Sequence, residues 1–250
     1  MARPLVLAAH GTADPAGQAV IHDLAAAAQA RLGVPVHPGF VDVCAPTLTQ
    51  ALAGLVAPVV VPAFLTSGYH VGHDVPLAAA RVPDALVTPA FGAAPEVVEA
   101  LAARLREASG GRVEAPVAMV AAGSTDPAAR GEVDLAAARL GALVGRPAVA
   151  GFLTGPGPTA HEAIHAAIAL AAGTGEPGDA VVPSASRSEP GGRSTRVLVA
   201  AYLLAPGHFA RRLERLCTDL GLTAAAPLGA HPRLVDLVVR RYLNAGDPRD

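Results

Sequence analysis

Residues 64–76 read F-L-T-S-G-Y-H-V-G-H-D-V-P, and the fold of the chain is organised around them. They follow an apolar, β-branched run at residues 59–61 and precede residues 77–80, whose Leu and Ala suit a helix. This order predicts a strand, a glycine-containing loop and a helix start. The loop carries His70 and His73 where the strand leads into the helix. Loops in this position hold ligands in open α/β sheets, although two solvent-facing histidines would give the same local pattern.

A second histidine loop stands near the start of the chain. Residues 5–9 (L-V-L-A-A) predict a fully buried strand because they lack the alternation of a half-exposed one. H-G-T at residues 10–12 follows at once, so His10 lies at the carboxyl end of this strand. D-P at residues 14–15 suits the cap and first turn of a helix, and Asp74 is expected to cap the helix after the other loop.

The sequence contains two similar halves in tandem. Residues 4–11 (P-L-V-L-A-A-H-G) are matched by residues 116–123 (P-V-A-M-V-A-A-G), and His70 is matched by His208. The second copy carries an insertion at residues 173–196, rich in Gly, Pro, Ser and Arg, for which we expect a mobile loop. Strands alternate with helices in both copies, which predicts parallel β-α-β units with right-handed crossovers.

We divide the chain into an N-terminal half at residues 1–110 and a C-terminal half at residues 116–245. The halves differ where chemistry is expected, because His10 of the first half corresponds to Ala122 of the second. A pair of metal-binding histidines can therefore form in the first half alone. The second half is expected to be a degenerate copy without a metal site.

Composition and patterning narrow the function classes. The 250-residue chain is 52% hydrophobic and has a net charge of −2, so no general basic surface argues for nucleic acid. Its longest apolar stretch, residues 51–65, is broken by Pro58 and Pro62 and is too short to span a membrane. Cys44 and Cys217 match no C-x-x-C metal pattern and suit a reduced setting. Without a signal-peptide pattern, a cytoplasmic location is expected.

The two histidine loops together resemble the class II chelatases. H-G-T after the first strand and F-L-x-x-G-x-H-x-x-x-D-V-P after the third are similar to the motifs of CbiX/SirB-type sirohydrochlorin chelatases in a two-half, single-chain form. The likeness covers nearly all of residues 4–242. It implies an α/β fold of two similar flavodoxin-like halves, each a four-stranded parallel sheet flanked by helices. It also implies that a tetrapyrrole binds in the cleft between the halves.

The resemblance further implies a set of site residues. His10 and His70 correspond to the two family histidines that bind the metal and act in catalysis, and His10 to the one that accepts a proton. The expected contacts with the substrate come from Gly11, Thr12, Leu65, Thr66, Ser67, Gly68, Tyr69 and His208. Family members often carry an acidic residue where this chain has Ala45, and Asp42 keeps the acidic character nearby with a shorter reach. The roles of Asp42 and His73 stay open.

The implied reaction is the insertion of Fe²⁺ or Co²⁺ into sirohydrochlorin for siroheme or cobalamin synthesis, a lyase activity. The metal is then a substrate, and no permanently bound cofactor is expected. The implied partners are the small-molecule tetrapyrrole and the divalent metal, with no nucleic acid and no membrane. A monomer with pseudo-two-fold halves follows from the tandem organisation.

Strand order supports the same histidine pair on physical grounds. In a flavodoxin-like order 2-1-3-4, the first and third strands are neighbours and their crossovers leave in opposite directions, which makes their carboxyl ends a ligand-binding point. His10 and His70 stand at those two ends. Both could reach one cation and leave coordination positions open, unlike a closed structural zinc site. Imidazole suits Fe, Co and Ni alike, and a neutral imidazole can accept a pyrrole proton.

Two alternatives stay open at this point. A non-catalytic carrier of metal or tetrapyrrole could use the same fold, because fold does not determine function. Separately, residues 161–165 (H-E-A-I-H) match the H-E-x-x-H pattern of zinc metalloproteases. By the internal repeat this pattern falls on residues 49–53, in the first turns of a flanking helix, and no third ligand follows it.

Overall fold

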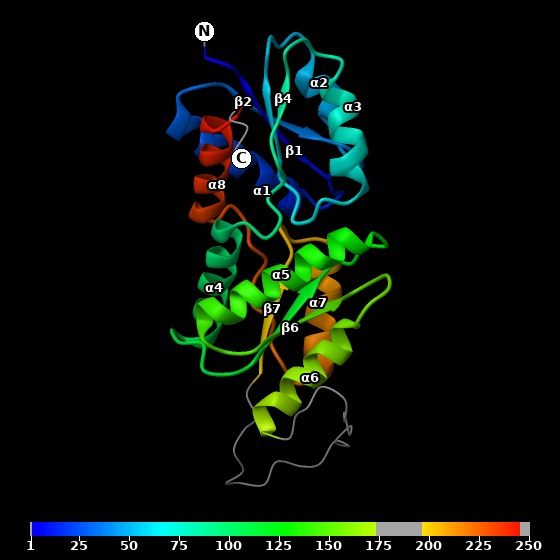
Figure 1. The fold of residues 1–250 in the computed structure, drawn as a ribbon, viewed down its shortest axis with the longest axis vertical. Coiled ribbons are helices and arrows are strands. Elements are labelled where there is room, and N and C mark those ends of the chain that lie inside the picture. The colour runs from blue at the N-terminus through cyan, green and yellow to red at the C-terminus, as the bar shows by residue number, and fades with distance from the viewer. Residues whose placement is uncertain (1, 174–196, 246–250) are drawn as a thin grey trace.

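The computed structural model describes residues 2–173 and 197–245, in which strands and helices alternate (Figure 1). The first half contains β1 (Leu5–Ala9), α1 (Pro15–Leu32), β2 (Val36–Phe40), α2 (Leu48–Leu52), β3 (Val59–Pro62), a π-helical turn (His70–Asp74), α3 (Val75–Ala79), β4 (Leu86–Val87) and α4 (Pro95–Ser109). The second contains β5 (Val117–Ala121), α5 (Pro127–Val144), β6 (Ala148–Phe152), α6 (Ala160–Ala172), β7 (Leu198–Tyr202), α7 (His208–Asp219) and α8 (Pro232–Leu243). The mobile loop expected at residues 173–196 lies outside the described residues, apart from Gly173.

The first sheet has the predicted order β2-β1-β3-β4, and its strand pairs are parallel. All five residues of β1 are buried because helices cover both faces of the sheet. Leu5 and Leu7 belong to the core on one side, and Val6 and Ala8 to the core under α2 and α3 on the other. The α/β fold class and the flavodoxin-like order are confirmed.

The second sheet has three strands in the order β6-β5-β7, where the family resemblance implies four, so this part of the expectation is wrong. In place of a fourth strand, a single parallel bridge joins Val199 to Ala224. The segment around Ala224 is rich in alanine and reaches Pro227 three residues later, so it combines low strand propensity with a missing backbone donor. These properties limit the pairing to one bridge.

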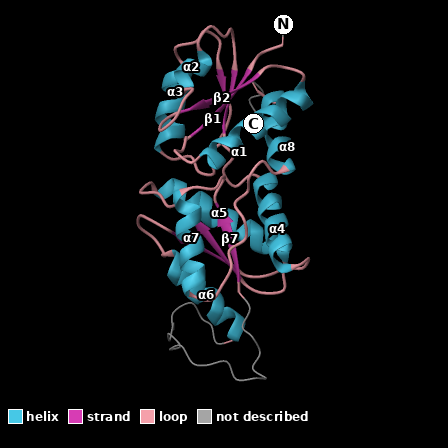
Figure 2. Ribbon diagram, turned by 180° about the vertical axis from the view of Figure 1, so that it is seen from behind, coloured by secondary structure: helices cyan, strands magenta, loops and turns pink. Residues whose placement is uncertain are grey.

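The two halves exchange their last helices. In both Figure 1 and Figure 2, α4 lies beside the second sheet, and α8 lies beside the first sheet next to α1. Accordingly α4 packs against α5 and β7, while α8 packs against α1 and β3. Glu96 of α4 and Arg240 of α8 form an ion pair of 2.7 Å where the helices pass each other. The largest apolar core therefore runs through both halves without a break.

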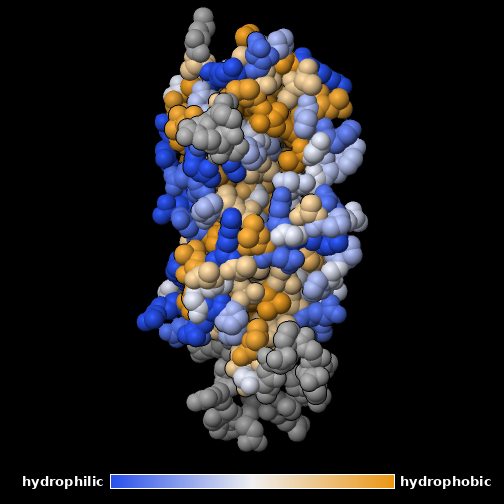
Figure 3. All heavy atoms as spheres, in the orientation of Figure 1, coloured by the Kyte–Doolittle hydropathy of each residue, from blue (hydrophilic) through white to orange (hydrophobic). Residues whose placement is uncertain are grey.

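The division of the chain near residues 110–116 stays a prediction based on the sequence repeat, since each sheet is covered by one helix from the other half. On the face drawn in Figure 3, hydrophilic residues occupy both flanks and apolar residues gather along the middle. Among the described residues, we find no helix that is both long enough and apolar enough to cross a bilayer.

Candidate active site

The structure brings His10 and His70 together at the carboxyl edge of the first sheet. β1 and β3 are adjacent, with Ala8 paired to Pro62, so the loops that leave them start side by side. The two imidazole ring centroids are 4.7 Å apart and the ring planes meet at 81°. His10 is exposed and the His70 side chain is 32% exposed, so both rings are open to a ligand. The sequence-predicted pair is therefore one cluster in space.

Asp74 holds His70 in place from the next helical turn. Its Oδ2 lies 2.5 Å from His70 Nδ1, and its Oδ1 lies 3.0 Å from Nδ1 of His73. The hydrogen bonds from His73 and then from His70 lower the pKa of the Asp74 carboxyl below its usual value. An ionised carboxylate only accepts hydrogen bonds, so His70 Nδ1 must carry the proton. The Nε2 lone pair of neutral His70 is then free to bind a metal.

The expectation that Asp74 caps a helix is wrong. Its side chain makes no hydrogen bond to the start of α3. Residues 70–74 are already helical in a π-type turn, and the Val75 N–H bonds back to the carbonyl of His70. Because the helix begins before Asp74, the amides that a cap would serve already have backbone partners. The carboxylate turns to the two histidines instead, and such π-type turns are frequent at functional sites.

A close backbone approach fixes His10. Gly11 has φ = +99°, and a Cβ at this position would lie 2.0 Å from the carbonyl oxygen of Asp42. Only glycine combines this conformation with this contact. His10 Nδ1 lies 3.3 Å from the Gly11 carbonyl oxygen, so a proton on Nδ1 leaves Nε2 free. The Asp42 carboxylate accepts a hydrogen bond of 2.7 Å from the Val43 N–H, so it binds the backbone of its own loop.

The histidine pair forms an open donor set. Within residues 2–173 and 197–245, no cluster of three or more His, Cys, Asp and Glu side chains is arranged to hold a metal ion. A closed structural zinc site has four protein ligands, whereas an ion bound here would keep positions for a further ligand. This arrangement suits transfer of an ion better than its storage.

A cavity of about 230 Å³ lies between the two halves; His10 lines it, whereas His70 does not and reaches it through its contact with His10. The first half contributes His10, Gly11, Thr12, Phe64, Leu65 and Thr66, and the second contributes Ala122, Gly123, Ser124, Tyr202, Leu203 and Leu204, among others. His10 and its counterpart Ala122 thus face the same space from the two halves. Most of the lining is apolar, which suits the face of a flat organic ring.

Four predicted substrate contacts do not line this cavity: Ser67, Gly68, Tyr69 and His208. Ser67 donates its backbone N–H to Glu132 of the second half at 2.7 Å. Tyr69 is exposed and stacks on His73 with ring centroids 4.9 Å apart. His208 is the exposed first residue of α7. Gly11, Thr12, Leu65 and Thr66 do line the cavity, and the role of all eight residues stays a prediction.

Sequence reasoning missed the residues that join the cavity walls. The buried hydroxyl of Tyr202 lies 2.8 Å from the carbonyl oxygens of both Leu65 and Gly92. Burial, and then the charge of Glu132, raise the pKa of Tyr202 far above its usual value. A signal was present, because the sequence places the polar hydroxyl of Tyr202 in an otherwise apolar strand. A buried phenol needs a hydrogen-bond partner, and here the partner lies across the halves.

The second histidine motif lies on α6. His161 and His165 face each other with Nε2 atoms 3.2 Å apart. Glu162 forms a capping box with Thr159, whose N–H and hydroxyl lie 2.7 and 2.9 Å from the same carboxylate oxygen. A zinc protease uses this glutamate as a general base next to the metal. With Glu162 engaged at the helix start, the structure disfavours the protease alternative.

Comparisons with known proteins identify relatives of this chain. Residues 4–108 match the CbiX family model. The chain is 32% identical over 77 residues to a sirohydrochlorin cobaltochelatase of Methanothermobacter thermautotrophicus, a match that covers 29% of this chain. The matched region spans 54% of that curated relative, about half of its length.

Solved structures match over the whole length. SirB from Bacillus subtilis with Fe³⁺ has a TM-score of 0.78 at 21% identity, covering 100% of this chain and 98% of that one. CbiX, described as the terminal enzyme of siroheme biosynthesis in denitrifying bacteria, has a TM-score of 0.62 at 21% identity, covering 97% and 99%. A multi-domain protein of Deinococcus radiodurans with structural similarity to chelatases has a TM-score of 0.66 at 19% identity, covering 100% and 56%. The resemblance predicted from the two histidine loops is confirmed.

Proposed function

We propose that this chain is a sirohydrochlorin chelatase, which inserts Fe²⁺ or Co²⁺ into the tetrapyrrole bound at the cavity between its halves. The observation that carries the proposal is the 4.7 Å approach of His10 and His70 beside a largely apolar cavity. An exposed two-imidazole site can bind a first-row divalent ion and release it again. The match of residues 4–108 to the CbiX family model supports the same activity.

The two histidines account for both the metal and the protons. Insertion of a divalent ion displaces two N–H protons from the macrocycle, and each imidazole that releases the metal exposes a lone pair. His10 faces the cavity and takes the first proton. His70 takes the second, because the Asp74 carboxylate at 2.5 Å stabilises the imidazolium that forms. Charge balances, since one dication enters the macrocycle and two protons leave it.

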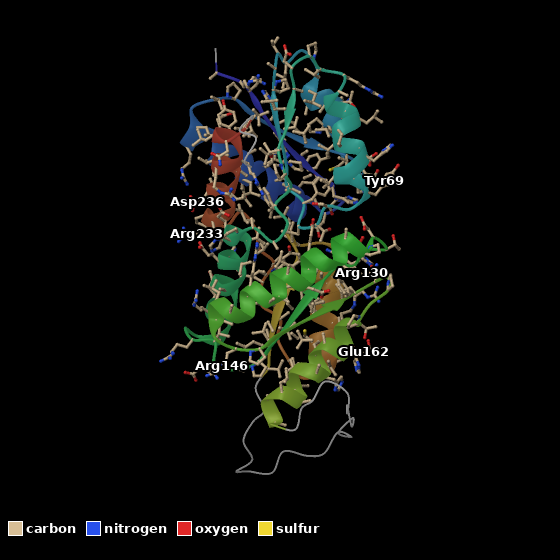
Figure 4. The ribbon with its side chains drawn as sticks, viewed as in Figure 1. Tyr69, Arg130, Arg146, Glu162, Arg233 and Asp236 are labelled. Carbon is tan, nitrogen blue, oxygen red and sulfur yellow. The ribbon has the colours of Figure 1, made fainter. Side chains whose placement is uncertain are left out.

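The carboxylates of sirohydrochlorin need cationic and N–H partners around the cavity. Arg130 of α5 holds the carbonyls of Ser124 and Thr125 with Nη1, at 3.2 and 2.9 Å, which fixes its guanidinium at the edge of the second half. Figure 4 shows Arg130 on the same side of the molecule as Tyr69 of the first half. An anchored guanidinium binds carboxylates in a defined geometry. We assign Arg130 to substrate binding, together with the backbone amides of Gly11 and Thr12.

The cavity is smaller than the roughly 300–1,000 Å³ of ordinary ligand pockets. The macrocycle therefore enters by one edge, with part of its carboxylates outside. Both walls come from the same chain, so a monomer suffices for the reaction. We place the protein in the cytoplasm, with either siroheme or cobalamin synthesis as its pathway.

Anaerobic assays with sirohydrochlorin and either Co²⁺ or Fe²⁺ test the proposal. The wild-type protein should change the absorbance of the tetrapyrrole faster than the spontaneous reaction. His10→Ala and His70→Ala should each remove most of this rate, while His22→Ala, an exposed histidine on α1, should leave it unchanged. Binding of the metal and tetrapyrrole without turnover would support the carrier alternative and contradict a chelatase.

A further inference from the structure

We propose that His161 and His165 on α6 form a second, independent binding site for a first-row transition-metal dication. The site lies on the second half, outside the cavity that holds the proposed chelation site. Both histidines reach solvent, and the site consists of their two imidazoles alone. The inference does not depend on the proposed chelatase activity.

The distance between the two Nε2 atoms matches the separation of two imidazole nitrogens bound to one metal ion. His161 Nε2 and His165 Nε2 are 3.2 Å apart, and the ring centroids are 4.3 Å apart. With metal–nitrogen bonds of about 2.0–2.1 Å, two imidazoles are about 3.3 Å apart at a tetrahedral angle and about 2.9 Å apart at a right angle. The observed separation lies between these values. The same distance suits an Nε2–H···Nε2 hydrogen bond, which a bound ion replaces: the proton of the donating ring moves to Nδ1, and both Nε2 lone pairs then face the ion.

The helix supplies this arrangement through its spacing. Positions i and i+4 lie on one face of an α-helix, one turn apart. The capping box between Thr159 and Glu162 fixes the start of α6, so the face that carries the histidines is well defined from its first turn. Because Glu162 accepts hydrogen bonds from Thr159, the donor set is two neutral nitrogens without a carboxylate.

This donor set determines the class of ion. Imidazole favours Co²⁺, Ni²⁺, Cu²⁺ and Zn²⁺, whereas Mg²⁺ and Ca²⁺ require oxygen ligands. Water completes the coordination of an ion at an exposed two-histidine site. The ions that suit this site are the same class that suits the pair in the first half. The chain should then bind two such ions when no tetrapyrrole is present.

Calorimetric titration with Ni²⁺ alone tests the proposal in a His10→Ala/His70→Ala background, where the cleft pair is removed. This double variant should bind one ion per chain at α6. Adding His165→Ala should weaken that binding by roughly tenfold or more, since one of two ligands is lost. Alanine is the best helix former, and circular dichroism should show an unchanged helix content.

A matched control keeps the number of histidines constant. In His165→Ala/Ala166→His, the second histidine moves by one position, about 100° around the helix, and no longer faces His161. We expect this variant to lose the site as His165→Ala does. If the His10→Ala/His70→Ala protein binds Ni²⁺ with the same affinity before and after these changes at residues 165 and 166, the proposal is wrong. The Cu²⁺ form should show two equivalent nitrogen couplings by electron paramagnetic resonance, and a spectrum with a single nitrogen would also contradict it.

Discussion

Removal of the Asp74 carboxylate tests how the site presents its metal ligand. In the structure this side chain binds Nδ1 of both His70 and His73, at 2.5 and 3.0 Å. Asp74→Ala leaves His70 free to rotate and to place its proton on either nitrogen. Loss of such an outer partner typically costs about 10- to 100-fold in metal affinity or activity. We expect a loss in this range for chelation, seen mainly as a higher KM for the metal.

The matched control is His73→Ala, which removes the other partner of Asp74 and keeps its bond to His70. This variant should retain close to wild-type kinetics, because the hydrogen bond between Asp74 and His70 stays in place. Asp74 is one-third exposed, so Asp74→Ala should leave the thermal midpoint nearly unchanged. The lowered pKa of Asp74 keeps the carboxylate ionised near neutral pH, so the effect should persist across that range. Unchanged chelation in Asp74→Ala would refute the orienting role, and equal losses in both variants would refute its specificity.

Two further variants test the frame of the site. Tyr202→Phe removes the hydroxyl that the partly buried carbonyls of Leu65 and Gly92 share. This should cost about 1–3 kcal/mol and lower Tm by about 2–10 °C, and an unchanged Tm in calorimetry would contradict it. Burial raises the pKa of Tyr202 in the folded protein. The contribution of Tyr202 to the free energy of unfolding is therefore complete below the pKa of a tyrosine in the unfolded chain, about 10, and is lost as the pH rises above that value. The alkaline loss of stability measured by denaturant titration should therefore be smaller in Tyr202→Phe than in the wild type. Gly11→Ala should displace the loop that carries His10, because the added Cβ would lie 2.0 Å from the Asp42 carbonyl oxygen. We expect this variant to lose chelation while its far-ultraviolet circular dichroism spectrum keeps its helical shape. Full activity would contradict the assigned role of Gly11.

The sequence predicted local structure well where one segment contains the whole signal. The buried run of β1, the cap at Asp14 and the tandem copy at β5 are visible in short stretches, and the structure confirms them. The meeting of His10 with His70 followed from strand order, because parallel neighbours end at the same edge of a sheet.

The sequence did not predict contacts between segments that lie far apart in the chain. The apolar faces of α4 and α8 predict that each helix is packed, but periodicity carries no information on which sheet they cover. Asp74 has the residue type and position of a cap, and the preceding π-type turn redirects it to the histidines. Glu132 and Tyr202 contact backbone groups that lie far from them in sequence, so no local pattern indicated which groups they would bind.

The location of the metal tests the central claim most directly. A crystal of the wild-type protein soaked with Co²⁺ and measured at the cobalt absorption edge reports each bound ion by its position. We predict an ion between His10 and His70, bound through Nε2 of both rings, and none beside Ala122 in the second half. Cobalt at His208, with none between His10 and His70, would contradict the assigned active site.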